Sequence, residues 1–296
     1  MFLNKKTIHR IIGAILAVLF VGEIVYSVNN TELATRSTGE TIQIVHNPWD
    51  TEIASSTVLA LVLEEVGYNV NLVSVDNAIM FESISTGESD VMTAAWLPTT
   101  HGTIIEEYED DMVDLGPNLE GASSGIGVPS YMDVDSITDL DSQADQTIIG
   151  IEPGAGAMIQ TEEAMSHYDN IRDWELEAPS TGAMLASLDG AIQNEEEFVF
   201  VAWTPHWMFL EYDIKMLEDP DFVYGEAEDI YTFTRLGFAE DHPEANEIVD
   251  RFFWKIDDME NVTLAMQNGT DNRTAAQNWI DENRETVDSW LEGVFE

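Results

Sequence analysis

Three tryptophans, Trp49, Trp96 and Trp203, lie where predicted β-strands end, and two of them share the pattern Ala-Trp-x-Pro, at 95–98 and 202–205. A cation over the negative face of an indole ring gains about 0.5–2 kcal/mol, depending on its desolvation. A trimethylammonium group donates no ordinary hydrogen bond, so ring faces and shape select it without a carboxylate counter-ion. A single tryptophan is more often packing. Three at equivalent strand ends predict an aromatic cage for a quaternary ammonium group.

The segment 153–156, Pro-Gly-Ala-Gly, lies between a predicted strand and a predicted helix. The first amides of a helix have no intrahelical acceptor, and with the helix dipole they form an anion site. The segment lacks the lysine of a P-loop and the glycine spacing of a dinucleotide motif. The sequence therefore indicates an anion site here but argues against a phosphate cradle.

The elements that must position these residues alternate between strand and helix. The first series is predicted as strand Thr41–His46, helix 51–66 ended by Gly67, strand 69–75, helix 78–86 and strand 90–95. The second series is predicted as a helical 136–140, strand 147–151, helix 155–168, strand Glu175–Glu177, helix 181–193 and strand 198–202. Such alternation is typical of mostly parallel sheets, whose ligands bind at the carboxyl ends of the strands. We expect two α/β lobes with a strand at 127–129 passing between them, followed by C-terminal helices whose aromatic side chains are core.

Composition excludes several classes of function. The 296 residues carry 57 acidic and 11 basic side chains, for a net charge of −46, and no cysteine. A nucleic-acid interface needs a basic face, which this chain cannot build. Without cysteine there are no disulfides, thiolate metal sites, cysteine nucleophiles or lipidated cysteines.

Residues 41–296 keep 7 of the basic and 54 of the acidic residues, which gives this part of the chain a net charge of −47. Salt screens such repulsion, so a halophilic, high-salt exterior is the simplest interpretation, and an ordinary acidic exported protein is the alternative.

The N-terminus predicts export. Lys5, Lys6 and Arg10 precede an apolar run at 11–28, which is nearly long enough to span a bilayer. We expect residues 1–28 to be a membrane anchor with the body on the extracellular face of the cytoplasmic membrane. The alternative is a cleaved signal peptide and a secreted protein. Residues 29–40 are polar and unpatterned, as in a linker.

Six segments give the chain a resemblance to a known family. They are 49–54 (WDTEIA), 95–101 (AWLPTTH), 127–132 (GVPSYM), 150–156 (GIEPGAG), 203–209 (WTPHWMF) and 225–230 (GEAEDI). Together they resemble the glycine betaine-binding proteins of ABC importers, of the OpuAC type and more distantly ProX. The resemblance implies a two-lobed periplasmic-binding-protein-like fold with a ligand cleft between the lobes. It implies lobe 1 at 41–128, lobe 2 at 129–232, and a C-terminal helical segment at 233–296 that returns to lobe 1.

The resemblance also implies a role for each site residue. Trp49, Trp96 and Trp203 match the ammonium cage, while His101 and the backbone amides of Gly156 and Ala157 match the carboxylate contacts. The implied partners are a betaine and an ABC permease with a separate ATPase subunit, with no cofactor, metal or catalytic residue. Two departures are the missing lipobox cysteine and Ala157, which stands where the family has a bulkier aliphatic residue.

Other interpretations remain open. A choline or carnitine receptor would use the same cage. Gly121-Ala122-Ser123-Ser124-Gly125 matches the G-x-S-x-G elbow of a serine hydrolase, with Ser123 as nucleophile, although such short patterns arise by chance. His206 could ligate a metal but is more simply structural, and His101 could merely cap the helix that follows it. The interpretation best supported by the sequence is a receptor that captures betaine for uptake.

Overall fold

The computed structural model describes residues 38–294. The predicted anchor at 1–28 and nearly all of the predicted linker at 29–40 lie outside the described residues. Within 38–294, no helix has both the length and the apolar character needed to cross a membrane.

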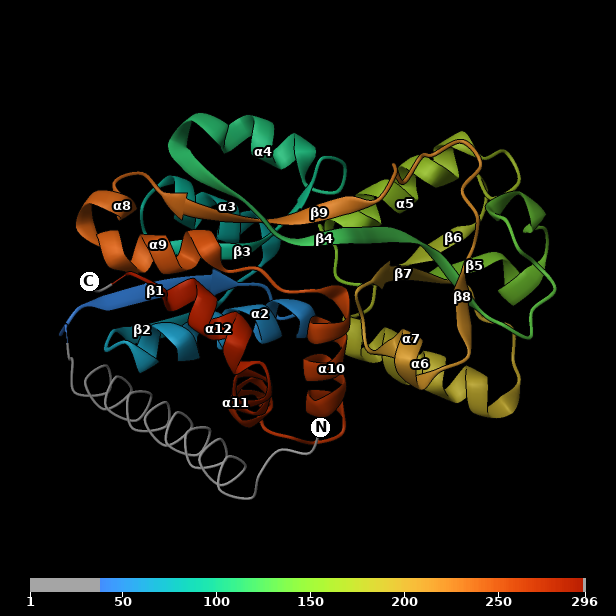
Figure 1. The fold of residues 1–296 in the computed structure, drawn as a ribbon. Helices are drawn as coiled ribbons and strands as arrows, with labels where there is room; N and C mark the ends of the chain where they lie inside the picture. The colour runs from blue at the N-terminus through green and yellow to red at the C-terminus, as the bar shows by residue number, and fades with distance from the viewer. Residues whose placement is uncertain (1–37, 295–296) are drawn as a thin grey trace, which may run out of the picture.

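Two α/β lobes lie side by side in Figure 1, joined by two long strands. The first lobe begins with β1 (Thr41–His46), α2 (Asp50–Glu65), β2 (Asn69–Ser74), α3 (Asn77–Ser85), β3 (Val91–Leu97) and α4 (Gly102–Tyr108). The second lobe holds β5 (Thr147–Ile149), α5 (Gly156–His167), β6 (Glu175–Glu177), α6 (Thr181–Asn194), β7 (Phe200–Thr204), α7 (Met208–Glu211) and β8 (Ile214–Met216). These bounds follow the predicted elements closely, except that 136–140 is reduced to a 3₁₀ turn at Ile137–Asp139.

The crossing strands are β4 (Met112–Pro129) and β9 (Glu228–Arg235), and the second of them is followed by α8 (Phe238–Asp241). The described strands form one sheet in the order β2-β1-β3-β9-β4-β7-β5-β6, with β8 paired to β4. The predicted parallel pairing holds within each lobe, between β1 and its neighbours and between β5 and its neighbours. Every pair that includes β4 or β9 is antiparallel, because one strand leaves the first lobe and the other returns to it.

The chain changes lobe within β4. Its residues up to Ala122 pair with β9, Ser123–Gly127 pair with β7, and Gly127–Pro129 pair with β8. β9 in turn pairs with β3 of the first lobe along its length. The predicted domain limits at 128/129 and 232/233 stay a prediction. The partner of β4 changes at 122/123, and β9 already pairs with β3 from Asp229 onward.

Four further helices complete the chain: α9 (Pro243–Arg251), α10 (Ile256–Gln267), α11 (Asn272–Glu282) and α12 (Arg284–Leu291). They pack against α2 of the first lobe. Trp279 packs edge-on against Trp254 and stacks on Trp290, with ring centroids at 5.6 and 6.0 Å, and all three are buried. The prediction that the C-terminal aromatic residues are core is confirmed for Phe252, Trp254, Trp279 and Trp290, but it is wrong for Phe253, which is 38% exposed. Arg284 adds a two-pronged ion pair to Glu65 at the end of α2, at 2.7 and 2.8 Å.

Candidate functional site

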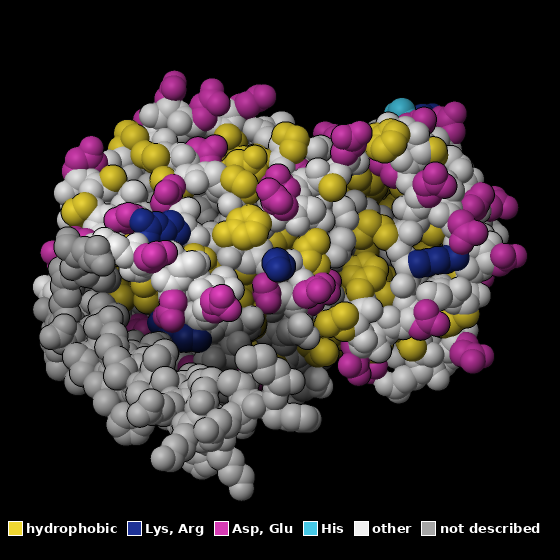
Figure 2. All heavy atoms as spheres, in the orientation of Figure 1, with side chains coloured by type: hydrophobic (Ala, Val, Ile, Leu, Met, Phe, Trp, Pro, Cys, Tyr) yellow, Lys and Arg dark blue, Asp and Glu magenta, His cyan; other side chains and the backbone are white. Residues whose placement is uncertain are grey.

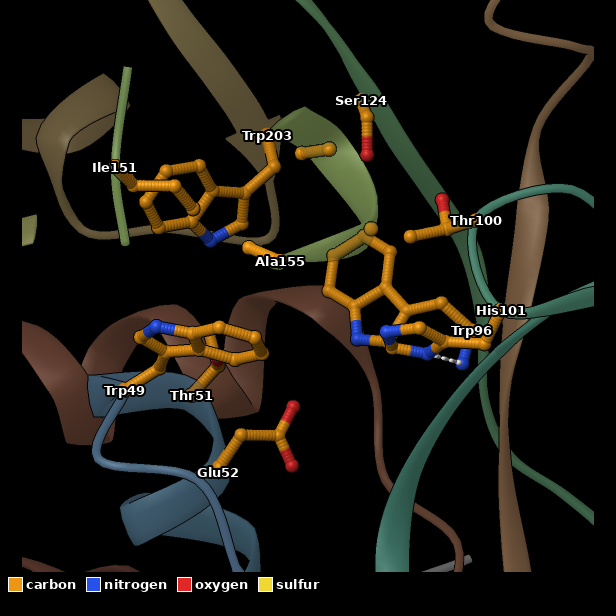
Figure 3. A pocket seen from close by; sticks show the side chains of 12 residues that line it. Trp49, Thr51, Glu52, Trp96, Thr100, His101, Ser124, Ile151, Ala155 and Trp203 are labelled. Atoms are coloured by element: carbon orange, nitrogen blue, oxygen red, sulfur yellow. Dashed lines mark hydrogen bonds between the residues drawn. The ribbon is translucent and has the colours of Figure 1, made fainter. Parts of the chain in front are cut away.

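A pocket with a cavity volume of about 40 Å³ lies between the two lobes (Figure 3). Trp49 and Trp96 come from the first lobe and Trp203 from the second, and all three side chains line it. Trp96 and Trp203 are 6% and 7% exposed, so their ring faces are nearly withdrawn from water. The remaining lining residues are Thr51, Glu52, Thr100, His101, Ser124, Ile151, Ala155, Gly156 and Ala157. The fold thus brings all six residues predicted for the site into one pocket, and their contacts with a ligand stay a prediction.

The crossing strands hold two of the tryptophans. Trp96 is the next-to-last residue of β3 and pairs with Ile230 of β9. Trp203 lies in β7 and pairs with Ser124 of β4. β4 pairs in both lobes and β9 leads the chain back into the first lobe, so each indole lies beside a strand where the chain passes from one lobe to the other.

Trp49 is positioned differently, at the start of a helix. It occupies the N-cap position of α2, and its carbonyl accepts the backbone N–H of Ile53 at 2.9 Å. Its indole N–H donates to Glu152 of the second lobe at 3.2 Å. The Glu152 carboxylate also accepts the backbone N–H of Thr181 at 2.8 Å and its hydroxyl at 2.7 Å. These hydrogen bonds lower the pKa of Glu152 although its partial burial alone would raise it.

His101 presents an unpartnered donor to the pocket. Its Nδ1 accepts the backbone N–H of Trp96 at 3.0 Å, which places the ring proton on Nε2. Nε2 is buried and has no protein partner. Burial lowers the pKa of His101 to about 4, so the ring is neutral at neutral pH. Although His101 precedes α4, its side chain makes no capping bond to that helix, so the capping alternative is wrong.

Gly156 and Ala157 are the first two residues of α5, whose opening amides have no acceptor within the helix. A Cβ on Gly156 would lie 2.4 Å from the Thr100 Cγ2 and 2.7 Å from the Thr100 carbonyl oxygen. Only glycine therefore allows the start of α5 to approach the loop that carries His101. The helix N-terminus and the His101 donor lie on the same pocket, where both can meet one anionic group.

The sequence reasoning missed a carboxyl group in this pocket. Glu52, in the first turn of α2, is 2% exposed, and its Oε2 has no partner. Burial raises the pKa of Glu52 to about 8, partly offset by a hydrogen bond from the side chain of Trp96. The expectation that the cage would do without a carboxylate therefore needs correction, because a largely protonated acid lies beside it (Figure 3). Its position three residues after Trp49, on one helical face, was the signal that could have revealed it.

The serine hydrolase interpretation is wrong. Ser123 lies inside β4 and pairs with Thr204, whereas a nucleophile elbow requires a sharp turn from strand to helix. Its neighbour Ser124 lines the pocket instead. His206, the candidate metal ligand, is buried with Nδ1 accepting the backbone N–H of Met208 at 3.1 Å. Among residues 38–294 there is no cluster of three or more side chains that could hold a metal ion.

Comparison with known proteins places these observations in context. A family described as the substrate binding domain of ABC-type glycine betaine transport systems matches residues 40–282. The glycine betaine/carnitine transport binding protein GbuC of Listeria monocytogenes is 43% identical over 174 residues, which cover 58% of this chain and 57% of that protein. The chain thus matches little more than half the length of this curated relative.

Two solved structures are similar over most of the chain. The closed, liganded form of lactococcal OpuAC in complex with glycine betaine has a TM-score of 0.84 and 43% identity, covering 86% of this chain and all of that one. The ProX glycine betaine/L-proline-binding protein from Borrelia burgdorferi has a TM-score of 0.82 and 34% identity, covering 87% of this chain and all of that one. The predicted two-lobed α/β fold is confirmed by these similarities.

Proposed function

This chain belongs to the family of substrate-binding domains of ABC-type glycine betaine transport systems, and from that premise we propose that it captures glycine betaine for uptake. The observation that carries the proposal is the pairing, in one pocket, of three indoles with the Nε2 donor of His101 and the open amides of α5. A zwitterion with a trimethylammonium head and a carboxylate tail matches both halves of this pocket.

The cage acts on the ammonium end. Trp49, Trp96 and Trp203 offer ring faces that attract a cation and exclude water from its methyl groups. The attraction is larger for Trp96 and Trp203, whose burial leaves little solvent to screen it. Because trimethylammonium cannot be held by hydrogen bonds, ring faces and shape supply the selectivity at this end.

The carboxylate end is held by donors of two kinds. The neutral His101 gives one N–H from Nε2, and the amides of Gly156 and Ala157 give two more at the positive end of α5. None of these donors needs to lose or gain a proton when the ligand enters. The pocket therefore binds and releases its ligand unchanged, which suits a transport receptor and involves no catalysis.

Substrate-binding proteins of ABC importers act outside the cytoplasmic membrane and hand their ligand to a permease driven by an ATPase. The proposed partners of this chain are accordingly a permease and a separate ATPase subunit. A membrane anchor at residues 11–28 would keep the receptor beside that permease. Closure of the second lobe over the first would complete the cage, because Trp203 and the start of α5 come from the second lobe.

Carnitine and choline are the competing ligands. Carnitine also joins a trimethylammonium group to a carboxylate, and GbuC carries both betaine and carnitine in its name. Choline has an alcohol in place of the carboxylate and would leave the donors of His101 and α5 without a charged acceptor. The donors therefore favour a zwitterion, which both betaine and carnitine are.

Calorimetric titration of the full chain in a non-ionic detergent, at molar KCl, tests this function. Glycine betaine, proline betaine, carnitine and choline are titrated in parallel. We expect betaine to bind and choline to bind at least about tenfold more weakly, since choline loses charge-assisted hydrogen bonds. Absence of betaine binding, or choline binding as tight as betaine, would contradict the proposal.

A further inference from the structure

Two hydrogen bonds connect the lobes across the cleft, each between an indole N–H and a carboxylate. Both involve the neighbouring residues Trp49 and Asp50 of the first lobe. The indole N–H of Trp49 in the first lobe donates to Glu152 in the second, at 3.2 Å. In the opposite direction, the indole N–H of Trp207 in the second lobe donates to Oδ2 of Asp50 in the first, at 2.8 Å. The turn at 49–50 is thus fixed to the second lobe by one donor and one acceptor.

Asp50 and Trp207 are not part of the pocket lining. Asp50 is the first residue of α2, directly after the cage residue Trp49. Trp207 is 1% exposed and directly precedes α7. A buried indole N–H needs an acceptor, and for Trp207 that acceptor is supplied by the other lobe.

The surroundings of Trp207 belong to the second lobe. Its ring packs against those of His206 and Tyr212, with centroids at 5.2 and 5.9 Å. Tyr212 in turn reaches Asp189 of α6, at 3.4 Å. The ring is therefore held by its own lobe, and only its N–H reaches across to Asp50.

We propose that Asp50 and Trp207 form an interlobe latch that raises betaine affinity without touching the ligand. The inference rests on the proposed function, since it concerns the affinity for betaine. Separating α2 from the segment before α7 breaks this bond and leaves a buried donor unpaired. The latch therefore favours the closed arrangement. The apparent affinity for a ligand enclosed by both lobes is proportional to the fraction of protein molecules in the conformation that can close around it.

The chain contains a matched control. Trp279 on α11 donates its indole N–H to Oδ1 of Asp258 on α10, at 3.0 Å, and both helices pack against α2 of the first lobe, although α10 also contacts α7. Trp279→Phe removes the same kind of hydrogen bond as Trp207→Phe but leaves the bond between Trp207 and Asp50 in place. The two variants therefore separate loss of a bond within one lobe from loss of a bond between lobes.

Calorimetry with glycine betaine on the full chain compares Trp207→Phe, Asp50→Ala, the double variant and Trp279→Phe. We expect each latch variant to raise the Kd by about five- to twentyfold, the effect of losing a hydrogen bond to a charged group. The double variant should be close to either single one, because both remove the same interaction. Trp279→Phe should lower the thermal midpoint and leave the Kd unchanged.

A second measurement keeps the two proposals apart. Hydrogen–deuterium exchange on the ligand-free chain should show faster exchange around 49–53 and 206–212 in both latch variants, but not in Trp279→Phe. If wild type fails to bind betaine, the proposed function fails, and unchanged exchange in the latch variants then overturns the latch as well. If wild type binds and the latch variants bind equally well, or if their effects simply add, the latch alone is overturned.

Discussion

Glu228, the first residue of β9, accepts the backbone N–H of Thr100 at 2.7 Å, and the Thr100 hydroxyl donates to the same carboxylate. Glu228 is 1% exposed, and it also accepts the backbone N–H of Thr99. The loop that follows Trp96 and carries His101 is thereby attached to a strand that passes between the lobes. A buried carboxylate outside the pocket thus fixes the residues that lead into it.

Replacing Glu228 should weaken binding through that loop. We expect Glu228→Ala to cost about 1–3 kcal/mol in betaine affinity, because the amides of Thr99 and Thr100 lose their acceptor in a buried place. Glu228→Gln keeps an acceptor oxygen and should restore most of the affinity. Calorimetry on both variants checks this. Equal affinity in wild type and Glu228→Ala would show that the loop holds its shape without the carboxylate.

The cage makes a second prediction. Replacing Trp49, Trp96 or Trp203 by Ala should each cost about 1–3 kcal/mol in betaine affinity, through loss of a ring face and of apolar contact. The control is Trp254→Phe, which alters the aromatic stack of the C-terminal helices and should lower the thermal midpoint only. The cage hypothesis fails if the three replacements lower the midpoint but leave the titrated Kd unchanged.

The residues of the site that could be predicted are those tied to strand ends and helix starts. Trp96 and Trp203 follow from the repeated Ala-Trp-x-Pro pattern, because the carboxyl ends of neighbouring strands face one cleft. Glu52 escaped this reasoning, since an acid in the first turn of a helix is ordinarily a solvated, dipole-stabilised group. Only the packing of the cage over α2 turns it into a buried acid.

The place where the chain passes from the first lobe to the second was also only partly predictable. The segment 127–129 was predicted as a strand between lobes, yet β4 begins at Met112 and runs from the first lobe into the second. A long strand with changing partners has no single burial pattern, because Ala122 and Ser123 belong to different surroundings. The bond between Asp50 and Trp207 joins positions 157 apart, and no periodicity in the chain reports such a contact.

Glu52 gives a prediction for pH. Its carboxyl ionises at a pKa of about 8 in the folded chain, against 4.5 as its ordinary value. The folded state therefore binds more protons than the unfolded state between these values, so the free energy of unfolding falls as pH rises through them. From pH 6.5 to 8 the fall from this group is about 1–2 kcal/mol. Glu52→Gln should remove it.

Chemical denaturation of the ligand-free chain across pH 6.5 to 8.5 measures this difference. The buried histidines act in the opposite direction, since burial lowers the pKa of His101 to about 4 and that of His206 to about 3. Their contribution strengthens the fold as pH rises through 6.5, and because it is the same in wild type and Glu52→Gln, it cancels in the difference between the two. Parallel curves for wild type and Glu52→Gln would mean that Glu52 is ionised in the folded chain.

Salt is the subject of the fourth prediction. Acidic side chains are scattered over the face seen in Figure 2 and outnumber the basic ones there, and the chain carries a net charge of −46. At 1 M salt the Debye length is about 3 Å, so most of this repulsion is screened. We expect the free energy of unfolding to rise with KCl into the molar range, while betaine affinity changes less because short contacts hold a zwitterion.

Sucrose at equal osmolality is the control for that experiment, because it stabilises proteins by exclusion from the surface and does not screen charge. A halophilic chain gains much more from KCl than from sucrose. Equal stability at low and molar KCl, or an equal gain from sucrose, would count against the halophilic interpretation.

The last prediction separates a zwitterion from a simple cation at His101. His101→Asn keeps a side-chain acceptor for the backbone N–H of Trp96 but lacks a donor where Nε2 lies. We expect it to cost betaine about 1.5–3 kcal/mol, the range for a hydrogen bond to a charged group, and to change any choline binding little. Titration of both ligands into wild type and variant measures the difference. Equal losses for the two ligands would mean that His101 supports the pocket wall instead of binding a carboxylate, and would favour a choline receptor.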